Sequence, residues 1–260
     1  MIDFSKRHIG INSEEKKEML DCLKVKSIEQ LISETIPSNI RLKKDMELDP
    51  ALNEYDYLNH IKKLSKKNKI FKSYIGLGYN EAIIPSVIKR NILENPSWYT
   101  AYTPYQAEIA QGRMQALLNY QTIVCELTGM ELANASLLDE STAAAEAMTM
   151  LFSLRNKDQK NNNVNNFFVS NDTLSQTISL IKTRAQPLGI NVNIGGIDDF
   201  KFDKGYFGCL MQYPGIHGQV IDLAKYCKKA KLNGLKIVVA ADLLSLCLLK
   251  EPSCFGVDVV

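Results

Sequence analysis

One pair of residues in this 260-residue chain, Ser141 and Thr142, has side chains and a spacing that could bind a charged ligand. They open an alanine-rich segment predicted to be a helix over residues 143–154, and a helix N-terminus carrying two hydroxyls is a natural seat for a phosphate. Asp139 and Glu140, however, lie directly ahead of them. Two carboxylates would repel a dianion and accept hydrogen bonds from the helix amides themselves. The sequence therefore predicts a self-capped helix and a closed phosphate seat.

Asp242 is the second candidate, because it directly follows the apolar segment 236–241, a predicted strand. Open α/β sheets bind ligands beyond the carboxyl ends of their strands, so an acid here lies at the ligand edge. The alternative is that Asp242 caps a helix beginning near Leu243. Covalent carbonyl chemistry would also require a desolvated lysine. Lys250, the sole lysine after Asp242, lies in a polar loop beside Glu251, so we expect it at the surface.

The elements that would position these residues belong to one α/β domain. From residue 167 onward, strands alternate with helices, a pattern typical of a doubly wound, mostly parallel sheet. Ahead of this pattern, a long helix is predicted over residues 106–128, ended by Gly129. The predicted strands cover residues 167–170, 191–194, 207–213 and 236–241, and the helices between them cover 173–184 and 220–232.

Two boundaries follow from the same patterns. Residues 1–70 are predicted to form a helical N-terminal arm, with helix starts at Ser13 and Ser27 and a longer helix over 53–67, which leaves residues 71–260 as the α/β domain. Residues 257–260 have the pattern of one more strand. Natural proteins avoid a raw sheet edge, so we expect the chain to be a piece of a longer protein.

Composition excludes several classes of function. With 31 basic and 29 acidic residues, the net charge of +2 is too balanced to favour nucleic acid or a membrane surface as partner. The three histidines are scattered, so no metal site or Ser-His-Asp cluster is predicted. The six cysteines show no C-x-x-C spacing and are predicted to be reduced and buried. Without a signal peptide or a membrane span, the sequence indicates a cytoplasmic protein.

An aromatic stretch over residues 95–112 has a composition of its own. It contains the only tryptophan, Trp98, with Tyr99, Tyr102 and Tyr105, and no lysine or arginine. Its two prolines predict a rigid, ordered loop. Rings with hydroxyl tips suit places where one end is dry and the other polar, although ordinary surface packing is an open alternative. Residues 76–78 supply only two of the three glycines of a dinucleotide fingerprint, so NAD binding is not predicted.

This stretch, together with residues 74–79 and 134–148, resembles the P-protein of the glycine cleavage system, the pyridoxal-phosphate glycine dehydrogenase (decarboxylating). The likeness is to its amino-terminal half or first subunit; residues 7–10 and 241–244 fit as well, so it spans nearly the whole chain. The resemblance implies a fold-type I, pyridoxal-phosphate-dependent transferase-like α/β fold. It also implies a complete enzyme that decarboxylates glycine through pyridoxal phosphate and passes the aminomethyl group to the lipoyl arm of the H-protein.

The resemblance implies a supporting role for this part of the enzyme, whose working lysine lies in the other half. The resemblance places Asp242 where such enzymes pair an aspartate with the pyridinium nitrogen. Together with Ser141 and Thr142, the phosphate seat considered above, it would be a remnant of a cofactor site. We expect no catalytic residue in this fragment and no activity from it alone. We expect instead that one set of residues shapes the active-site mouth and orients glycine or the lipoyl sulfur: Tyr99, Tyr102, Thr103, Tyr105, Gln106 and Glu108.

The expected partners are the catalytic half or second subunit, which would hold most of the pyridoxal phosphate, and the lipoyl H-protein. A homodimer or a heterotetramer is the expected assembly. Two alternatives remain open: a self-sufficient aminotransferase-like enzyme with its own pyridoxal phosphate, and a non-catalytic scaffold or dimerisation half.

Overall fold

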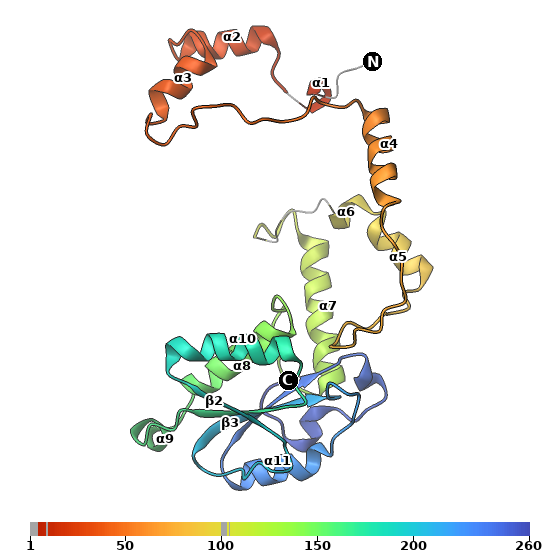
Figure 1. Ribbon diagram of the computed structural model, residues 1–260, viewed down its shortest axis with the longest axis vertical. Helices are drawn as coiled ribbons and strands as arrows, with labels where there is room; N and C mark the ends of the chain where they lie inside the picture. The colour runs from red at the N-terminus through yellow and green to blue at the C-terminus, as the bar shows by residue number, and fades with distance from the viewer. Residues whose placement is uncertain (1–4, 9, 100–102, 104) are drawn as a thin grey trace. The chain divides into compact units, whose positions relative to one another are not determined.

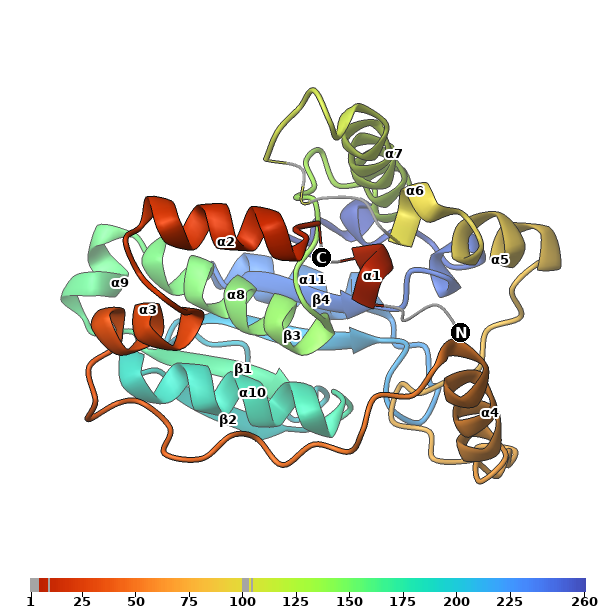
Figure 2. The same ribbon diagram turned by 90° about the horizontal axis from the view of Figure 1, so that it is seen from above.

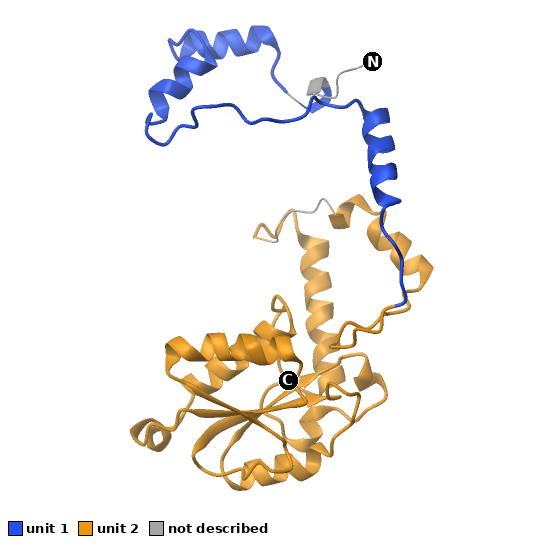
Figure 3. Cartoon of the chain, viewed as in Figure 1, with its two compact units in different colours: residues 1–72 blue, residues 73–260 orange. Residues whose placement is uncertain are grey.

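The structure is a computed structural model that describes residues 5–8, 10–99, 103 and 105–260. Figures 1 and 2 show the ribbon from two directions. The chain divides into two compact units, residues 1–72 and 73–260, drawn in different colours in Figure 3. The boundary predicted near residue 70, between a helical arm and the α/β domain, remains a prediction.

The first unit consists of short helices whose starts follow capping chemistry. Asn12, not the predicted Ser13, is the N-cap of α2: its side chain accepts hydrogen bonds from the Glu14 and Glu15 amides, and Glu15 bonds back to the Asn12 amide at 2.8 Å. Ser13 could not form this reciprocal pair, because Lys16, three residues later, has no acceptor. The helices of this unit are α1 (Ser5–His8), α2 (Ser13–Cys22), α3 (Ile28–Thr35) and α4 (Glu54–Ser65).

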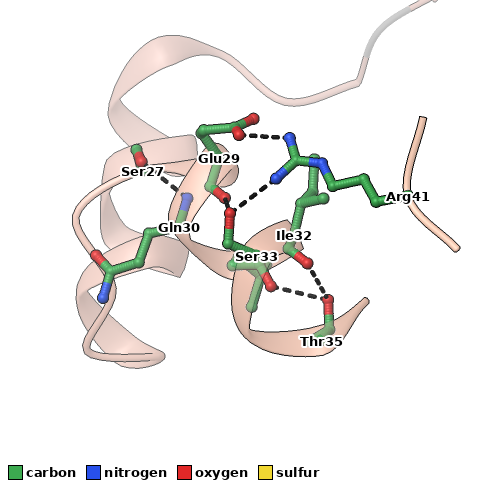
Figure 4. A network of polar contacts seen from close by, with 8 residues as sticks. Ser27, Glu29, Gln30, Ile32, Ser33, Thr35 and Arg41 are labelled. Atoms are coloured by element: carbon green, nitrogen blue, oxygen red, sulfur yellow. Dashed lines mark hydrogen bonds and ion pairs between the residues drawn. The ribbon is translucent and has the colours of Figure 1, made fainter. Parts of the chain in front are cut away.

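Helix α3 begins at the predicted cap and holds the segment that follows it (Figure 4). Ser27 accepts a hydrogen bond from the Gln30 amide at 3.1 Å. The Gln30 side chain bonds to the Lys26 amide rather than to Ser27, so the predicted capping box is incomplete. Arg41 contacts Glu29 through an ion pair and donates to Ser33 Oγ at 2.8 Å, which ties the chain after α3 back to that helix.

The second unit is built on a parallel sheet in the order β2-β1-β3-β4. All four predicted strands are present, within one residue of their predicted ends. Its strands are β1 (Asn166–Ser170), β2 (Asn191–Gly195), β3 (Tyr206–Tyr213) and β4 (Lys236–Ala241). Its helices are α5 (Ser86–Leu93), α6 (Pro96–Tyr99), α7 (Gln111–Thr128), α8 (Glu140–Ser153), α9 (Lys157–Asn161), α10 (Ser175–Ala185) and α11 (Leu223–Leu232), with 3₁₀ turns η1 (Gln186–Leu188), η2 (Ser245–Cys247) and η3 (Pro252–Phe255).

Helices cover both faces of the sheet. Helices α8 and α10 lie on one face and α11 on the other (Figure 1). Successive strand residues point to opposite faces, so Phe167 and Val169 join the core under α8 and α10, while Phe168 joins the core over α11. Because both faces are covered at β1, β3 and β4, these strands are nearly continuous apolar runs, whereas β2, at the edge of the sheet, alternates asparagine with apolar residues and is partly exposed. The predicted doubly wound α/β fold is confirmed.

Four helices of the second unit begin elsewhere than predicted, among them α10 at Ser175 and α11 at Leu223, two and three residues after their predicted starts. Helix α7 begins at Gln111, five residues after the predicted start, because residues 106–110 close a separate turn through the Ala110 amide and the Gln106 carbonyl. Helix α8 begins at Glu140, ahead of the predicted residue 143, because Asp139 is its N-cap. Gly129 ends α7 in the left-handed conformation, as predicted.

The start of β4 is covered along its free edge by residues 258–259. Asp258 accepts hydrogen bonds from Lys236 Nζ at 2.7 Å and from the Ile237 amide at 2.9 Å. Val259 forms an isolated parallel bridge with Val238, which agrees with the strand pattern predicted for residues 257–260. The Val239 amide donates to the Val259 carbonyl at 2.9 Å.

Candidate functional site

The sheet order reverses between β1 and β3, which makes their carboxyl ends the place where an open α/β sheet binds ligands. In this chain the two loops that leave those ends are joined to each other. The Ile216 amide, after β3, donates to the carbonyl of Asp172, after β1, at 2.8 Å. The crevice expected at this point is therefore bridged by main chain.

The N-terminus of α8 is occupied by its own side chains. Asp139 accepts a hydrogen bond from the Thr142 amide at 2.7 Å, and its own amide donates to Thr142 Oγ1 at 3.0 Å. The hydrogen bond from the Thr142 amide holds the pKa of the Asp139 carboxyl below its ordinary value, because it stabilises the charged form. The self-capped helix predicted from the sequence is present.

The residues next to this cap are also engaged. Glu140 accepts a hydrogen bond from Gln212 Nε2 at 2.9 Å. Ser141 is buried and its hydroxyl lies 3.1 Å from that of Thr177, in the first turn of α10. Both hydroxyls of the predicted phosphate seat, Ser141 and Thr142, are therefore bonded within the protein. With two carboxylates beside them, these residues do not fit a dianionic phosphate.

Asp242 caps the turn that follows it, the alternative considered for it above. Its carboxylate accepts a hydrogen bond from the Leu244 amide at 3.2 Å, and its carbonyl accepts one from Ser245 Oγ at 2.7 Å. Its amide donates to the Tyr213 carbonyl at 3.0 Å, so Asp242 does lie beside the end of β3. No hydrogen bond joins Asp242 to Ser141 or Thr142, all three of which the structure describes.

Lys250 is exposed, with its Nζ 6.0 Å from the centre of the Phe255 ring. This agrees with the surface position predicted for it. An exposed amine keeps its hydration, so Lys250 is not placed as the desolvated nucleophile that carbonyl chemistry needs.

A pocket of about 370 Å³ lies between α7, α8 and β4. Most of its wall is aliphatic, including Leu210, Val238 and Ala240. Asp139 and Glu140 are its charged lining side chains, and among the residues that the structure describes no lysine or arginine lines it. The pocket therefore offers no positive charge to an anionic cofactor.

The aromatic stretch begins with a helical turn, because α6 spans four of its residues. Tyr99 and Tyr105 are 65% and 85% exposed, and Thr103, Gln106 and Glu108 are exposed as well. Tyr102 lies outside the described residues. No hydrogen bond in the described part of the chain joins these side chains to the carboxyl edge of the sheet, so the structure does not bring them together with Ser141, Thr142 and Asp242.

Three residues at these places were missed in the sequence. Gln212 is buried and bonds to Glu140; a polar residue near the end of an otherwise apolar strand was the available signal. Arg113 donates to the Trp98 carbonyl at 2.9 Å and lies 5.6 Å from the Trp98 ring, so it holds α6 against α7. Gln176, in the first turn of α10, bonds to the Leu77 carbonyl at 2.9 Å, and nothing in the local sequence indicates a contact 99 residues away.

The cysteine prediction was partly wrong. All six cysteines are free, but only Cys209 and Cys227 are buried, while Cys22, Cys247 and Cys254 are exposed. An apolar neighbourhood in sequence does not bury a side chain at the surface of a short helix or turn. Among the described residues, no group of three His, Cys, Asp or Glu side chains could hold a metal ion. Nor does the described part of the chain contain a helix long and apolar enough to cross a membrane.

Comparison with known proteins gives consistent matches. The family model described as glycine cleavage system P-protein matches residues 6–260. The chain is 60% identical to a glycine dehydrogenase (decarboxylating) of Christiangramia forsetii and 56% identical to that of Flavobacterium johnsoniae, in both cases over 99% of this chain and 27% of the relative. The chain thus spans about a quarter of the length of these curated relatives.

A solved structure agrees with these matches. The crystal structure of a glycine decarboxylase (P-protein) of the glycine cleavage system, in inhibitor-bound form, superposes with a TM-score of 0.83 at 27% identity and covers 99% of this chain and 57% of that one. With a family match over nearly its full length, the chain belongs to the glycine cleavage system P-protein family.

Proposed function

We propose that this chain is the supporting part of a glycine decarboxylase whose cofactor is held by the rest of the enzyme. The complete enzyme would remove the carboxylate of glycine and pass the aminomethyl group to the lipoyl arm of the H-protein. Pyridoxal phosphate, when bound in the other half, supplies the electron sink for that decarboxylation. The matching relatives, named glycine dehydrogenase (decarboxylating) and about four times as long, support this assignment.

The observation that carries the proposal is the closed N-terminus of α8. Asp139 caps the helix, Glu140 is bonded to Gln212, and the hydroxyls of Ser141 and Thr142 are already bonded. Asp242 accepts a hydrogen bond from the Leu244 amide in the turn that follows it, and Lys250 is exposed. The hydroxyls and acids that a self-sufficient enzyme would need thus make other contacts, and its candidate lysine lies at the surface, so we assign this chain no covalent step.

The aromatic stretch is the part of the chain that we assign to the shared active site. Tyr99, Tyr105 and Glu108 expose hydroxyl and carboxylate groups that a neighbouring surface can use. Hydroxyls can donate to the carboxylate of glycine, and a carboxylate can accept from its ammonium group. Thr103 and Gln106 belong to the same set, and Tyr102 is included from the sequence. Their role would be to orient glycine or the lipoyl sulfur, not to transfer protons to a cofactor.

Tyrosine-to-phenylalanine variants in the complete enzyme test this role. Tyr99→Phe and Tyr105→Phe remove a hydroxyl and keep the ring, so we expect glycine–bicarbonate exchange to fall by about fivefold to a hundredfold, as for the loss of a hydrogen bond of ~1–3 kcal/mol. Tyr55→Phe, at an exposed tyrosine of α4, is the matched control and should keep the wild-type rate. Unchanged exchange in Tyr99→Phe and Tyr105→Phe would refute the role of the stretch and favour a packing function.

A second experiment tests where the cofactor is held. This chain is incubated with pyridoxal phosphate, reduced with borohydride and analysed by mass spectrometry. We expect no stoichiometric cofactor adduct, whereas the complete enzyme should give one. An adduct on this chain that disappears in Lys250→Ala would identify a self-sufficient enzyme and overturn the proposal.

A further inference from the structure

Residues 76–78 form a left-handed turn at the start of the second unit. Gly76, Leu77 and Gly78 have φ angles of +66°, +56° and +85°. The Tyr79 amide donates to the Gly76 carbonyl at 3.0 Å and closes the turn. Glycine adopts these angles freely, but leucine does not, because its Cβ approaches the backbone carbonyl. Leu77 therefore keeps this conformation only where its surroundings impose it.

Two residues at the N-terminal end of α10 provide those surroundings. Gln176 Nε2 donates to the Leu77 carbonyl at 2.9 Å. Leu174, which is buried, lies so near Gly78 that a Cβ built there would be 2.8 Å from its Cδ1. A Cβ on Gly76, in contrast, would meet nothing within 4 Å. The turn thus contacts the start of α10 through a hydrogen bond at Leu77 and a packing contact at Gly78.

This contact lies at the carboxyl edge of the sheet. Helix α10 directly follows β1, and the loop between them carries Asp172, whose carbonyl bonds to Ile216 after β3. The residues that the turn contacts, Leu174 and Gln176, therefore closely follow Asp172 on the connection that leaves the carboxyl end of β1. The tyrosines that flank the turn, Tyr74 and Tyr79, are 83% and 67% exposed there.

We propose that Gln176 is a positioning residue, which holds the left-handed turn 76–78 on the carboxyl edge of the sheet and so fixes where the chain enters the α/β unit. The backbone carbonyl of Leu77 requires a hydrogen-bond donor, and the side-chain amide of Gln176 supplies one. This inference depends on the geometry of the turn and not on the function proposed above, so either one can fail alone.

Hydrogen exchange of the Tyr79 amide in the whole chain tests the proposal. Gln176→Glu keeps the shape of the side chain but replaces the donor with an acceptor, so we expect the Tyr79 amide to exchange about three- to tenfold faster. Gln176→Lys restores a donor and should exchange at close to the wild-type rate. Gln186→Glu, at the exposed opposite end of α10, is the matched control and should change nothing.

The amides of β3 and β4 serve as the internal reference, because a general loss of folding would raise their exchange too. The proposal is overturned if Gln176→Glu exchanges no faster than Gln186→Glu, or if Gln176→Lys is as fast as Gln176→Glu. A second pair of variants tests the packing contact. Gly78→Ala and Gly76→Ala strain the backbone alike, but only the former meets Leu174, so Gly78→Ala should loosen the turn more. Equal exchange in these two variants would contradict the contact.

Discussion

The hydrogen bond between Glu140 and Gln212 allows a direct test of how the N-terminus of α8 is closed. Gln212 is only 5% exposed, and its Nε2 lies 2.9 Å from the Glu140 carboxylate. Its Oε1 is buried without a hydrogen-bond partner among the described residues. Removing Glu140 would leave both ends of a buried amide unbonded, which is much more costly than the hydrogen bond is worth when both partners are present.

The expected magnitudes differ between the two partners. Glu140→Ala should lower the free energy of unfolding by about 1–2 kcal/mol, the lower part of the range for a buried group left unsatisfied, because Glu140 itself is exposed. Gln212→Met keeps the volume and removes both polar atoms, so it should cost less than about 1 kcal/mol. In the Gln212→Met background, Glu140→Ala should cost only what the loss of an acidic residue from the first turn costs, a few tenths of a kcal/mol, which leaves a coupling of about 1 kcal/mol.

Urea unfolding of the wild type, both single variants and the double variant provides this cycle. Glu146→Ala is the matched control on the same helix, since its contact with Arg184 spans 4.0 Å at an exposed position and should contribute little. The cycle also cancels the loss of an acidic residue from the first turn of α8, which occurs in both backgrounds. If the effects of Glu140→Ala and Gln212→Met simply add, the two residues do not act together and the closure described here is wrong.

Three further predictions follow from other parts of the structure. The first concerns Asp139, whose pKa is lowered in the folded protein, so that its cap contributes full stability above the unfolded pKa of about 3.9 and loses this contribution as the pH falls through the lower folded value. The difference in the free energy of unfolding between wild type and Asp139→Ala should therefore shrink below about pH 4. A difference that stays constant with pH would refute this prediction. Burial raises the pKa of Cys227 to about 11 and also raises that of Cys209. At pH 8, iodoacetamide should therefore modify the exposed Cys247 and leave both buried thiols unmodified until urea unfolds the chain, as measured by mass spectrometry. Equal modification of the three thiols in the native protein would contradict this prediction. Gly208→Ala should lower the free energy of unfolding in urea by about 1–3 kcal/mol, because the new Cβ would lie 3.0 Å from the Lys236 carbonyl oxygen. Gly112→Ala, on α7, would place its Cβ where no atom lies within 4 Å, so it should raise that free energy by roughly 0.5–1 kcal/mol. The reasoning fails if both changes have the same sign.

The strands β1, β3 and β4 could be predicted from the sequence because each is a short, largely apolar run between polar turns. Residues 167–170 and 236–241 show this pattern clearly, and burial on both faces leaves little freedom in where such strands end. Helix ends were harder to predict, because they depend on which polar side chain accepts the hydrogen bonds of the first backbone amides of the helix. Asn12 replaced Ser13 as a cap since only Asn12 has a glutamate three residues later.

The candidate site could be predicted only where its contacts are local. The cap by Asp139 and the turn at Asp242 are made within three residues, so the sequence contains both partners. Gln212 bonds to a residue 72 positions away and Gln176 to one 99 positions away. Such contacts depend on how the strands are ordered, and no property of either residue alone reveals them.

Asp258 has a consequence for strand pairing at the beginning of β4. An uncovered strand edge is a template on which a foreign strand can add, which is a common start of aggregation. At the beginning of β4 the Ile237 amide already donates to the Asp258 carboxylate, and the Val239 amide donates to the Val259 carbonyl. An intruding strand would therefore have to displace a charged group paired with Lys236 before it could bond there. Hydrogen bonding at the start of β4 is thus completed within the chain, by the Asp258 carboxylate and the Val259 carbonyl.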